Sequence, residues 1–333
     1  MRPSPAAVGR SLVSSFSQLI SNDLHTRHVD AVYRLVLDCV SAVNPSMRLY
    51  TFGSTVVYGV HEKGSDVDFV VLSQNDVEDG KGGDSATQVA KGLQADLLAK
   101  LAAVIKQKHL SWNVEEVRRA RVPVVRVKGG SAVDFDITAY RRNGVRNSAL
   151  LRAYFEQNPP CRWLSMSVKR WSKKSGLNAS TVGGSITSYG FNIMVVYYLL
   201  QRNYVQFVCP ESIDVANVEP MPPHIPLEEP ANNGEELGEQ VLDFLNFFSH
   251  EFDSERNVIS ISRPGITTKE NLRWTKGAED FARMNGEKVH YQWCIEDPYE
   301  LNLNVGRSVT PLKRDFLLKH LEKARNTGLL TMT

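Results

Sequence analysis

Residues 50–72 read YTFGSTVVYGVHEKGSDVDFVVL, and this stretch holds the pattern that decides the fold. Asp66 and Asp68 lead into the apolar run 69–72. Because side chains alternate between the two faces of a strand, both carboxylates should point the same way. Such hard oxygen ligands suit Mg²⁺, which binds one or two carboxylates and takes its other ligands from water and substrate phosphates. The Asp-x-Asp alone favours a metal site no more than it favours a strand whose acids face water.

Two Gly-Ser pairs in the same stretch, at 53–54 and 64–65, shift this balance. A glycine lets the backbone come close to a phosphate, and the hydroxyls of Ser54 and Ser65 can donate hydrogen bonds to it. Together with the two acids, these pairs predict a site for nucleotidyl transfer.

The bulk composition sets broad limits. A chain of 333 residues with 42% hydrophobic residues can bury two ordinary cores, so we expect two domains. The net charge of +2 gives no general attraction to nucleic acid, and any basic surface must be local. No apolar run reaches the roughly eighteen residues that a membrane-spanning helix needs. Four cysteines without Cys-x-x-Cys spacing argue against a disulfide framework or a zinc site and fit a reducing compartment: Cys39, Cys161, Cys209 and Cys294.

Residues 1–22 contain Arg2 and Arg10, several serines and no acid, a composition that mitochondrial transit peptides share. The same residues carry an amphipathic helical pattern, which we favour. We therefore expect a cytoplasmic protein, with a mitochondrial location as the alternative.

The hydrophobic periodicity predicts a small mixed sheet backed by helices, followed by a helical region. The expected strands are 48–52, 68–72, 112–118, 123–127 and 132–139, with helices at 30–43 and 88–109. After Arg146 helices are expected at 147–157, 162–175, 189–202, 236–252 and 312–326. Residues 210–239 carry six prolines and eight acids without Lys or Arg, which predicts an extended surface segment rather than a packed element.

A third carboxylate is needed in a two-ion phosphoryl-transfer site, to hold the ion on the attacking oxygen. Residues 133–137 read VDFDI, in which Asp134 and Asp136 share one face of an expected strand. Spacing does not choose between them, and both are equally compatible with acids on an edge strand.

Two further motifs could bind a nucleotide. Lys169 and Lys173 lie one helical turn apart and could neutralise β- and γ-phosphates, although such a pair is more often a solvated face. Ser188 and Tyr189 begin the next helix, where a serine hydroxyl could bind an anion and the ring could stack on a base. The alternative is a capping serine and a core tyrosine.

A local basic patch runs from residue 118 to residue 152, with nine basic residues against two acids. Such a patch attracts backbone phosphates, and it flanks the candidate acids. Arg121, Arg126 and Arg141 are therefore candidate RNA-binding residues. No signature of an added RNA-binding module occurs, so we expect weak, sequence-tolerant binding of RNA.

Taken together, these motifs resemble the DNA-polymerase-β-type nucleotidyltransferases, and more narrowly the branch of noncanonical poly(A) polymerases and terminal uridylyltransferases. The resemblance covers roughly residues 50–307 and is strongest to the compact trypanosomal RNA uridylyltransferases, which lack an inserted middle domain. A DIT motif at 136–138 with NSALL at 147–151 matches the branch and selects Asp136 over Asp134. The other motifs are GS…GSDVDF at 53–69, K-x-W-x-K at 169–173, SYG at 188–190 and CIEDPYELNLNVGR at 294–307.

The resemblance implies an α+β fold with two domains and an active site in the cleft between them. A polymerase-β-type nucleotidyltransferase domain, a small mixed sheet with helices, is expected at 40–145. A mainly helical, poly(A)-polymerase-like domain that recognises the base is expected at 1–39 and 146–333, with the N-terminal helix docked on it.

The resemblance also implies roles for site residues. Asp66 and Asp68 would hold both metal ions, while Asp136 would hold only the ion that activates the 3′-hydroxyl. Leu303 stands where several relatives have a histidine, so discrimination between bases has to come from pocket size and the hydrogen-bond pattern. The implied nucleotide contacts are Asn147 to the ribose 2′-hydroxyl, Ser65, Ser148, Lys169, Lys173 and Ser188 to phosphates, Tyr189 to the base, and Asp297 and Glu300 to the uracil edge.

The expected activity is transfer of UMP from UTP to the 3′-hydroxyl of RNA with release of pyrophosphate, supported by two Mg²⁺ ions for which Mn²⁺ can substitute. The expected partners are UTP and the single-stranded 3′ end of RNA, without a membrane, for a monomer that could also bind another protein. The alternatives are a poly(A)-type polymerase that uses ATP, a catalytically idle RNA-binding or scaffold relative, and a small-molecule nucleotidyltransferase.

Overall fold

The computed structural model describes residues 3–17, 23–78, 90–118, 122–181, 183–300 and 302–328. The chain divides into two compact units. We call residues 19–153 and 210–227 the sheet unit, and residues 1–18, 154–209 and 228–333 the helical unit.

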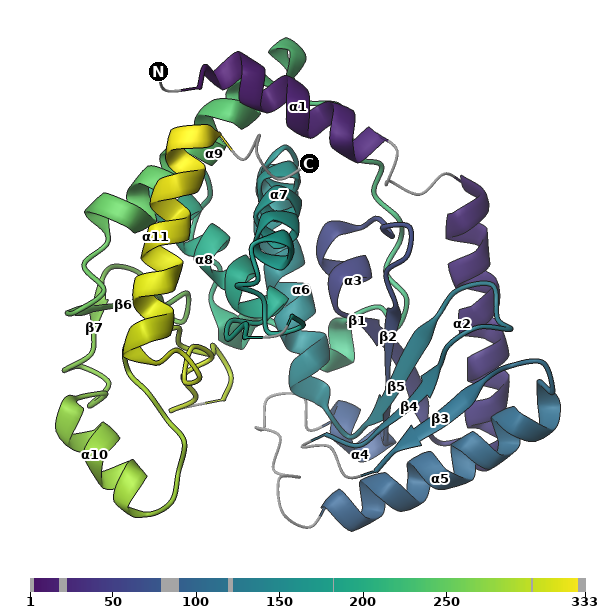
Figure 1. Ribbon diagram of the computed structural model, residues 1–333. Helices are drawn as coiled ribbons and strands as arrows, with labels where there is room; N and C mark the ends of the chain where they lie inside the picture. Colours follow the sequence, from purple (N-terminus) through teal and green to yellow (C-terminus); the bar gives the residue numbers. More distant parts are fainter. Residues whose placement is uncertain are drawn as a thin grey trace. The chain divides into compact units, whose positions relative to one another are not determined.

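The sheet unit is built on a five-stranded mixed sheet in the order β1-β2-β5-β4-β3 (Figure 1). Strands β2 and β5 are parallel, whereas all other neighbours are antiparallel. The strands are β1 (Arg48–Phe52), β2 (Val67–Leu72), β3 (Val114–Val117), β4 (Val124–Val127) and β5 (Phe135–Ala139). The prediction of a small mixed sheet with helices is confirmed.

One face of this sheet is apolar and is covered by α2 (Asp23–Val43) and α5 (Ala90–Lys108) (Figure 1). Val32 and Val36 of α2 and Ile105 of α5 pack there on Phe69 and Phe135, all nearly inaccessible to water. Each such side chain contributes about 1.5–3 kcal/mol through burial. Because strand side chains alternate, the intervening residues of β2 and β5 lie on the opposite face. This leaves the acids of both strands outside the core.

The opposite face of the sheet carries short elements and a strap that we define as residues 210–227. Thr51 of β1 donates its N–H to the carbonyl of Pro220, and Arg146 donates from Nε to the carbonyl of Ile213. Val215 is fully buried beside Tyr50. The strap is a surface segment, as predicted, since only Pro210 and Val215 of it are buried, and these contacts fix it to the sheet. The short elements are α3 (Ser54–Tyr58), α4 (Gln74–Glu78) and the 3₁₀ turns η2 (Pro210–Ser212) and η3 (Val215–Asn217).

The helical unit packs around α8 (Ser188–Gln201), which is apolar on all sides and buried from Gly190 to Leu199. Helix α1 (Pro5–Ser17) lies so close to α9 (Glu235–Asn246) that a Cβ on Gly238 would meet the carbonyl oxygen of Pro5 at 1.9 Å. The unit also contains α7 (Cys161–Lys174), η4 (Asn232–Gly234), the π-helical turn η5 (Phe247–Glu251), β6 (Asn257–Val258), β7 (Thr267–Thr268), α10 (Lys276–Met284) and α11 (Pro311–Thr327).

The sheet unit is larger than the catalytic domain of residues 40–145 that the sequence predicted. Helix α2 belongs to it because the valines of α2 complete the core under the sheet. The strap belongs to it through the bonds described above, and the division on the C-terminal side falls within α6 (Arg142–Gln157). In the part of the chain that the structure describes, no helix has the length and apolar character needed to cross a membrane.

Candidate active site

Asp68 and Asp136 are direct neighbours on two parallel strands. Their Cα atoms are register partners in the β2–β5 pair, so the two side chains lie on the same face of the sheet. Asp66 precedes Asp68 by two residues and by alternation shares that face, opposite the core. The structure thus brings the three predicted metal ligands to one end of two adjacent strands.

Asp134, which spacing could not separate from Asp136, has a different environment. Its Oδ1 atom accepts the backbone N–H of Gly129 at 2.9 Å. This bond fixes the turn between β4 and β5, where Gly129 has a φ of 81°. The structure therefore pairs Asp136 with Asp68 and gives Asp134 a bond within a loop.

Two cations balance the acids. Arg126 is the register partner of Asp136 across β4–β5 and holds both carboxylate oxygens, from Nε to Oδ1 at 3.0 Å and from Nη2 to Oδ2 at 2.9 Å. The hydrogen bond that Arg126 donates to Asp136 is the main cause that raises the pKa of Arg126, and the charges of Asp136, Glu115 and Asp66 add to it. Lys128 lies further off, with Nζ 3.9 Å from Oδ2 of Asp66.

The predicted role of Arg126 in binding RNA stays a prediction, as does that of Arg141, which is half-buried directly before α6. Arg121 lies outside the described residues.

The first Gly-Ser pair wraps around Asp68. Gly53 has a φ of 75°, and a Cβ on it would meet Oδ2 of Asp68 at 2.2 Å, so only glycine fits. The N–H of Gly53 donates to the hydroxyl of Ser148 at 2.8 Å, and this hydroxyl donates in turn to the carbonyl of Gly144. Ser54 follows as the first residue of α3. The predicted phosphate ligand Ser148 is thus buried and ties the loop to α6.

Asn147 and Ser65 lie near the same strand ends. Asn147 is half-buried on α6, and within the described residues its buried Oδ1 atom has no hydrogen-bond donor. A buried acceptor without a partner is costly and fits a ligand that carries a hydroxyl donor. Ser65 donates its backbone N–H to the carbonyl of Glu62 at 3.0 Å and its hydroxyl to Oε2 of Glu62 at 3.4 Å.

The residues of this cluster fit Mg²⁺ by their chemistry. Among the described residues, no group of three or more His, Cys, Asp or Glu side chains occurs that could hold a metal ion. One or two carboxylates suffice for Mg²⁺, however, because water and substrate phosphates supply its remaining ligands. Asp68 and Asp136 supply two oxygen ligands on one sheet face, with Asp66 two residues before Asp68, and this all-oxygen chemistry suits Mg²⁺.

In the helical unit, Lys169 and Lys173 lie one turn apart on α7, as predicted from their spacing. Lys169 is 5% exposed and has interactions of its own, whereas Lys173 is exposed. Only Lys173 therefore matches the alternative of a solvated helix face.

The start of α8 is capped by Thr187, whose hydroxyl accepts the N–H of Gly190 at 3.1 Å. The alternative that Ser188 is the cap is therefore wrong. The Oγ atom of Ser188 accepts a hydrogen bond from Nδ2 of Asn178 at 3.1 Å, so the hydroxyl proton can be donated elsewhere.

Tyr189 donates its hydroxyl to Oδ2 of Asp297 at 3.1 Å. Burial, and next the charge of Asp297, raise the pKa of Tyr189 well above its usual value, so the phenol stays a donor. Oδ1 of Asp297 accepts the N–H groups of Tyr299 at 2.9 Å and Glu300 at 2.8 Å. The buried Asp297 thus fixes the ring of Tyr189 and the turn that carries Glu300.

Glu296 is a residue that the sequence reasoning left without a role. It is almost fully buried, and its carboxylate accepts hydrogen bonds from the Ser260 hydroxyl and from Nη2 of Arg263, both at 2.5 Å. Its only signal in the sequence was its place directly before Asp297. The ion pair between Glu296 and Arg263 fixes the backbone next to Asp297.

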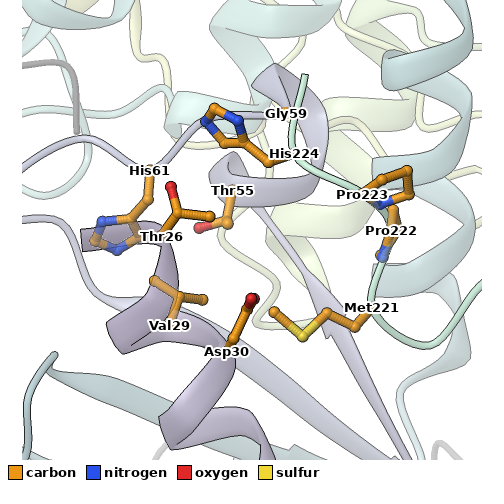
Figure 2. Close-up of a pocket in the computed structure, with 10 residues that line it drawn as sticks. All are labelled: Thr26, Val29, Asp30, Thr55, Gly59, His61, Met221, Pro222, Pro223 and His224. Carbon is orange, nitrogen blue, oxygen red and sulfur yellow. The ribbon is translucent and has the colours of Figure 1, made fainter. Parts of the chain in front are cut away.

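Figure 2 shows a pocket in another part of the sheet unit, between the start of α2, α3 and the strap. Its volume of about 40 Å³ holds roughly three water molecules rather than a nucleotide. None of the predicted site residues lines it. The lining residues are Thr26, Val29, Asp30, Thr55, Gly59, His61, Met221, Pro222, Pro223 and His224.

Comparisons with known proteins agree with this geometry. Residues 9–156 match the central palm domain of mitochondrial-like poly(A) RNA polymerases, and residues 236–303 match the Cid1 family of poly(A) polymerases. The chain is 83% identical over 332 residues to terminal uridylyltransferase 4 of Trypanosoma brucei brucei, with all of both chains covered.

Solved structures of the Trypanosoma brucei enzyme are also similar to this chain. One, with bound UTP and UpU, has a TM-score of 0.91 at 80% identity and covers 99% of each chain. Another, with bound ATP, has a TM-score of 0.92 at 81% identity and covers 99% of this chain and 100% of that chain. This chain belongs to the terminal uridylyltransferase family of polymerase-β-type nucleotidyltransferases.

Proposed function

We propose that this chain transfers UMP from UTP to the 3′-hydroxyl of RNA and releases pyrophosphate, with two Mg²⁺ ions as cofactors. The observation that carries the proposal is the pairing of Asp68 with Asp136 on parallel strands, with Asp66 on the same face, in a member of this family. Two separate parts of the sequence contribute these acids, which is the arrangement that two-ion phosphoryl transfer requires.

The residues of the sheet unit would act by charge and position. Asp66 and Asp68 would hold both ions, and Asp136 would hold only the ion that activates the 3′-hydroxyl. When bound, Mg²⁺ supplies Lewis-acid stabilisation of the charge that develops on the attacking and leaving oxygens. Asn147 would accept the ribose 2′-hydroxyl with its unpaired Oδ1 atom, which favours ribonucleotides.

The residues of the helical unit would bind the rest of UTP. Lys173 is exposed and could balance the charge of the departing phosphates, with Lys169 and Ser188 beside it on α7 and α8. Tyr189 would stack on the uracil, held in place by Asp297. Asp297 and Glu300 would face the uracil edge, where a carboxylate can accept the N3–H of uracil.

RNA is the proposed acceptor, and its single-stranded 3′ end would lie beside the three acids. The basic residues Arg121, Arg126 and Arg141 would bind its phosphates. We expect the grip to be weak and tolerant of sequence, and the enzyme to act as a monomer.

The test of the reaction uses two matched variants. Asp68→Asn should abolish the extension of a single-stranded RNA primer with radiolabelled UTP, whereas Asp134→Asn should keep most of it, because the Asp134 side chain accepts the N–H of Gly129 and the Oδ1 atom of Asn can keep that bond. Near-parent activity of Asp68→Asn would refute the assignment. Circular dichroism of both proteins checks that they fold.

A polymerase that uses ATP is the second candidate, because a close relative has been solved with bound ATP. Binding of a nucleotide therefore does not establish which base the enzyme uses, and turnover has to be measured. Each of the four nucleoside triphosphates is given alone to one RNA primer. Strong preference for UTP supports the proposal, and equal use of ATP defeats it.

We also propose a cytoplasmic location. The four cysteines are unpaired thiols, as expected in a reducing compartment. Imaging of the full chain with a C-terminal fluorescent tag tests this, and mitochondrial fluorescence would refute it.

A further inference from the structure

Arg126 holds Asp136 more tightly than a surface ion pair requires. Both oxygens of Asp136 are bonded, and the side chains of Arg126 and Asp136 are only 34% and 18% exposed. The two residues are register partners, so the sheet itself sets their separation. A two-pronged, charge-assisted pair of this kind is among the strong hydrogen bonds of proteins.

The neighbouring pair is much looser. Lys128 and Asp66 are 53% and 39% exposed, and a single separation of 3.9 Å joins them. Solvent screens such a pair, and the flexible lysine can leave at little cost. Asp136 and Asp66 therefore differ in their counterions. Arg126 holds Asp136 by two hydrogen bonds, whereas Lys128 lies 3.9 Å from Asp66.

We infer that Arg126 is the resident counterion of Asp136 and competes there with the divalent ion, so that the guanidinium weakens binding of the ion at Asp136. This rests on the proposed two-ion function. Two positive charges cannot share one carboxylate without mutual repulsion, which is strong at short range and low dielectric. The ion at Asp136 must therefore either share the carboxylate with Arg126 or displace Arg126 from it.

Arg126 also faces Glu115, its register partner on β3, and this exposed acid gives the guanidinium an alternative anion when it moves. The exchange needs only a side-chain rotation on a strand whose backbone stays paired. Arg126 is thus a positioning residue, which acts on the ion through Asp136.

The experiment titrates the full chain with Mn²⁺, without nucleotide or RNA, and counts free Mn²⁺ by electron paramagnetic resonance. The parent should show a tighter and a weaker class of site. Arg126→Gln removes the competing charge and should tighten the weaker class by about tenfold. Lys128→Gln, the control for loss of one positive charge, should change that class by less than about threefold. An unchanged weaker class in Arg126→Gln would overturn the inference.

Two further variants separate this inference from the proposed function. Asp136→Asn should remove the weaker class alone, whereas Asp68→Asn should weaken both classes, because Asp68 would hold both ions. If neither variant changes Mn²⁺ binding, the metal assignment of the proposed function fails. If both act as expected but Arg126→Gln binds like the parent, only the competition fails.

If Arg126→Gln folds poorly, a second variant and a second measurement test the same inference. Arg126→Lys keeps the charge but loses the two-pronged geometry, and should tighten the weaker class by an intermediate factor. In EDTA each Arg126 variant should melt roughly 2–4 °C below the parent, and Mn²⁺ should narrow this gap. A gap that Mn²⁺ leaves unchanged counts against the competition.

Discussion

The backbone N–H of Gly53 donates to the hydroxyl of Ser148, 2.8 Å away, although 94 residues lie between them in the chain. This bond joins the loop around Asp68 to helix α6, which also carries Asn147. The predicted phosphate ligand Ser148 is therefore a support for the loop in this structure.

Ser148→Ala should lower the free energy of unfolding by about 1–2 kcal/mol, because the N–H of Gly53 loses its acceptor. UTP extension should fall as well, since the loop loses its anchor near Asp68. Urea denaturation and steady-state kinetics measure both effects. Ser148→Cys keeps a weak acceptor, so its stability and activity should lie between those of the parent and of Ser148→Ala. Full stability of Ser148→Ala would contradict the support role.

Gly53→Ala should abolish UTP incorporation, because the new methyl group would meet Oδ2 of Asp68 at 2.2 Å and push the carboxylate away. Gly286→Ala is the matched control. Gly286 has a similar φ of 78° but open space around its Cβ position. It should cost only about 1 kcal/mol of stability, from backbone strain alone, and leave activity unchanged. Equal activity of the two variants would show that the contact with Asp68 is unimportant.

Tyr189→Phe should change how stability depends on alkaline pH. The raised pKa of Tyr189 means that above pH 10 the unfolded chain releases the phenol proton while the folded chain keeps it. The folded state then binds more protons, so its stability falls as pH rises, by up to about 1.4 kcal/mol per pH unit for this group.

Urea denaturation between pH 9 and pH 11 compares parent and variant. In Tyr189→Phe the free energy of unfolding should fall less steeply with pH, by the contribution of one proton. The ring should still stack on the base. The same pH slope in both proteins would argue that the hydrogen bond to Asp297 is absent in solution.

Arg263→Ala should destabilise the helical unit and weaken UTP binding. It leaves the Glu296 carboxylate, whose side chain is 5% exposed, with the Ser260 hydroxyl as its remaining side-chain donor among the described residues. A buried charge that loses a partner costs about 1–3 kcal/mol, here toward the lower end because Arg263 is half-exposed.

A double-mutant cycle with Glu296→Gln checks this explanation. The neutral amide needs no counter-charge, so Arg263→Ala should cost less in that background. Additive losses of stability would mean that the two residues act independently.

Alkylation should distinguish the four thiols. Burial raises the pKa of Cys161 and of Cys294 to about 12, so only about one part in ten thousand of each is thiolate at pH 8. Cys39 is buried with a raised pKa, whereas Cys209 is exposed. Iodoacetamide on the folded protein should therefore modify Cys209 first, as peptide mass spectrometry would show. Rapid labelling of Cys161 would contradict the burial.

Much of the fold followed from local patterns. The alternation in residues 66–72 placed both acids on one face and Val67, Phe69 and Val71 on the other, where they join the core under α2 and α5. Short or exposed elements escaped detection: α3 and α4 have five residues each, and no residue of α10 is buried, so none of them carries a long apolar stripe. Helix α2 begins at Asp23 rather than at residue 30.

By itself, the sequence determined the chemistry of this protein: the acids, the Gly-Ser pairs and the family motifs are properties of neighbouring residues. Only the tertiary structure decided that β2 and β5 are parallel partners, that Arg126 bonds to Asp136, and that Ser148 anchors Gly53. Strand pairing and side-chain partners depend on which distant segments pack together, because local conformation restricts a residue's face but not its neighbour across the sheet.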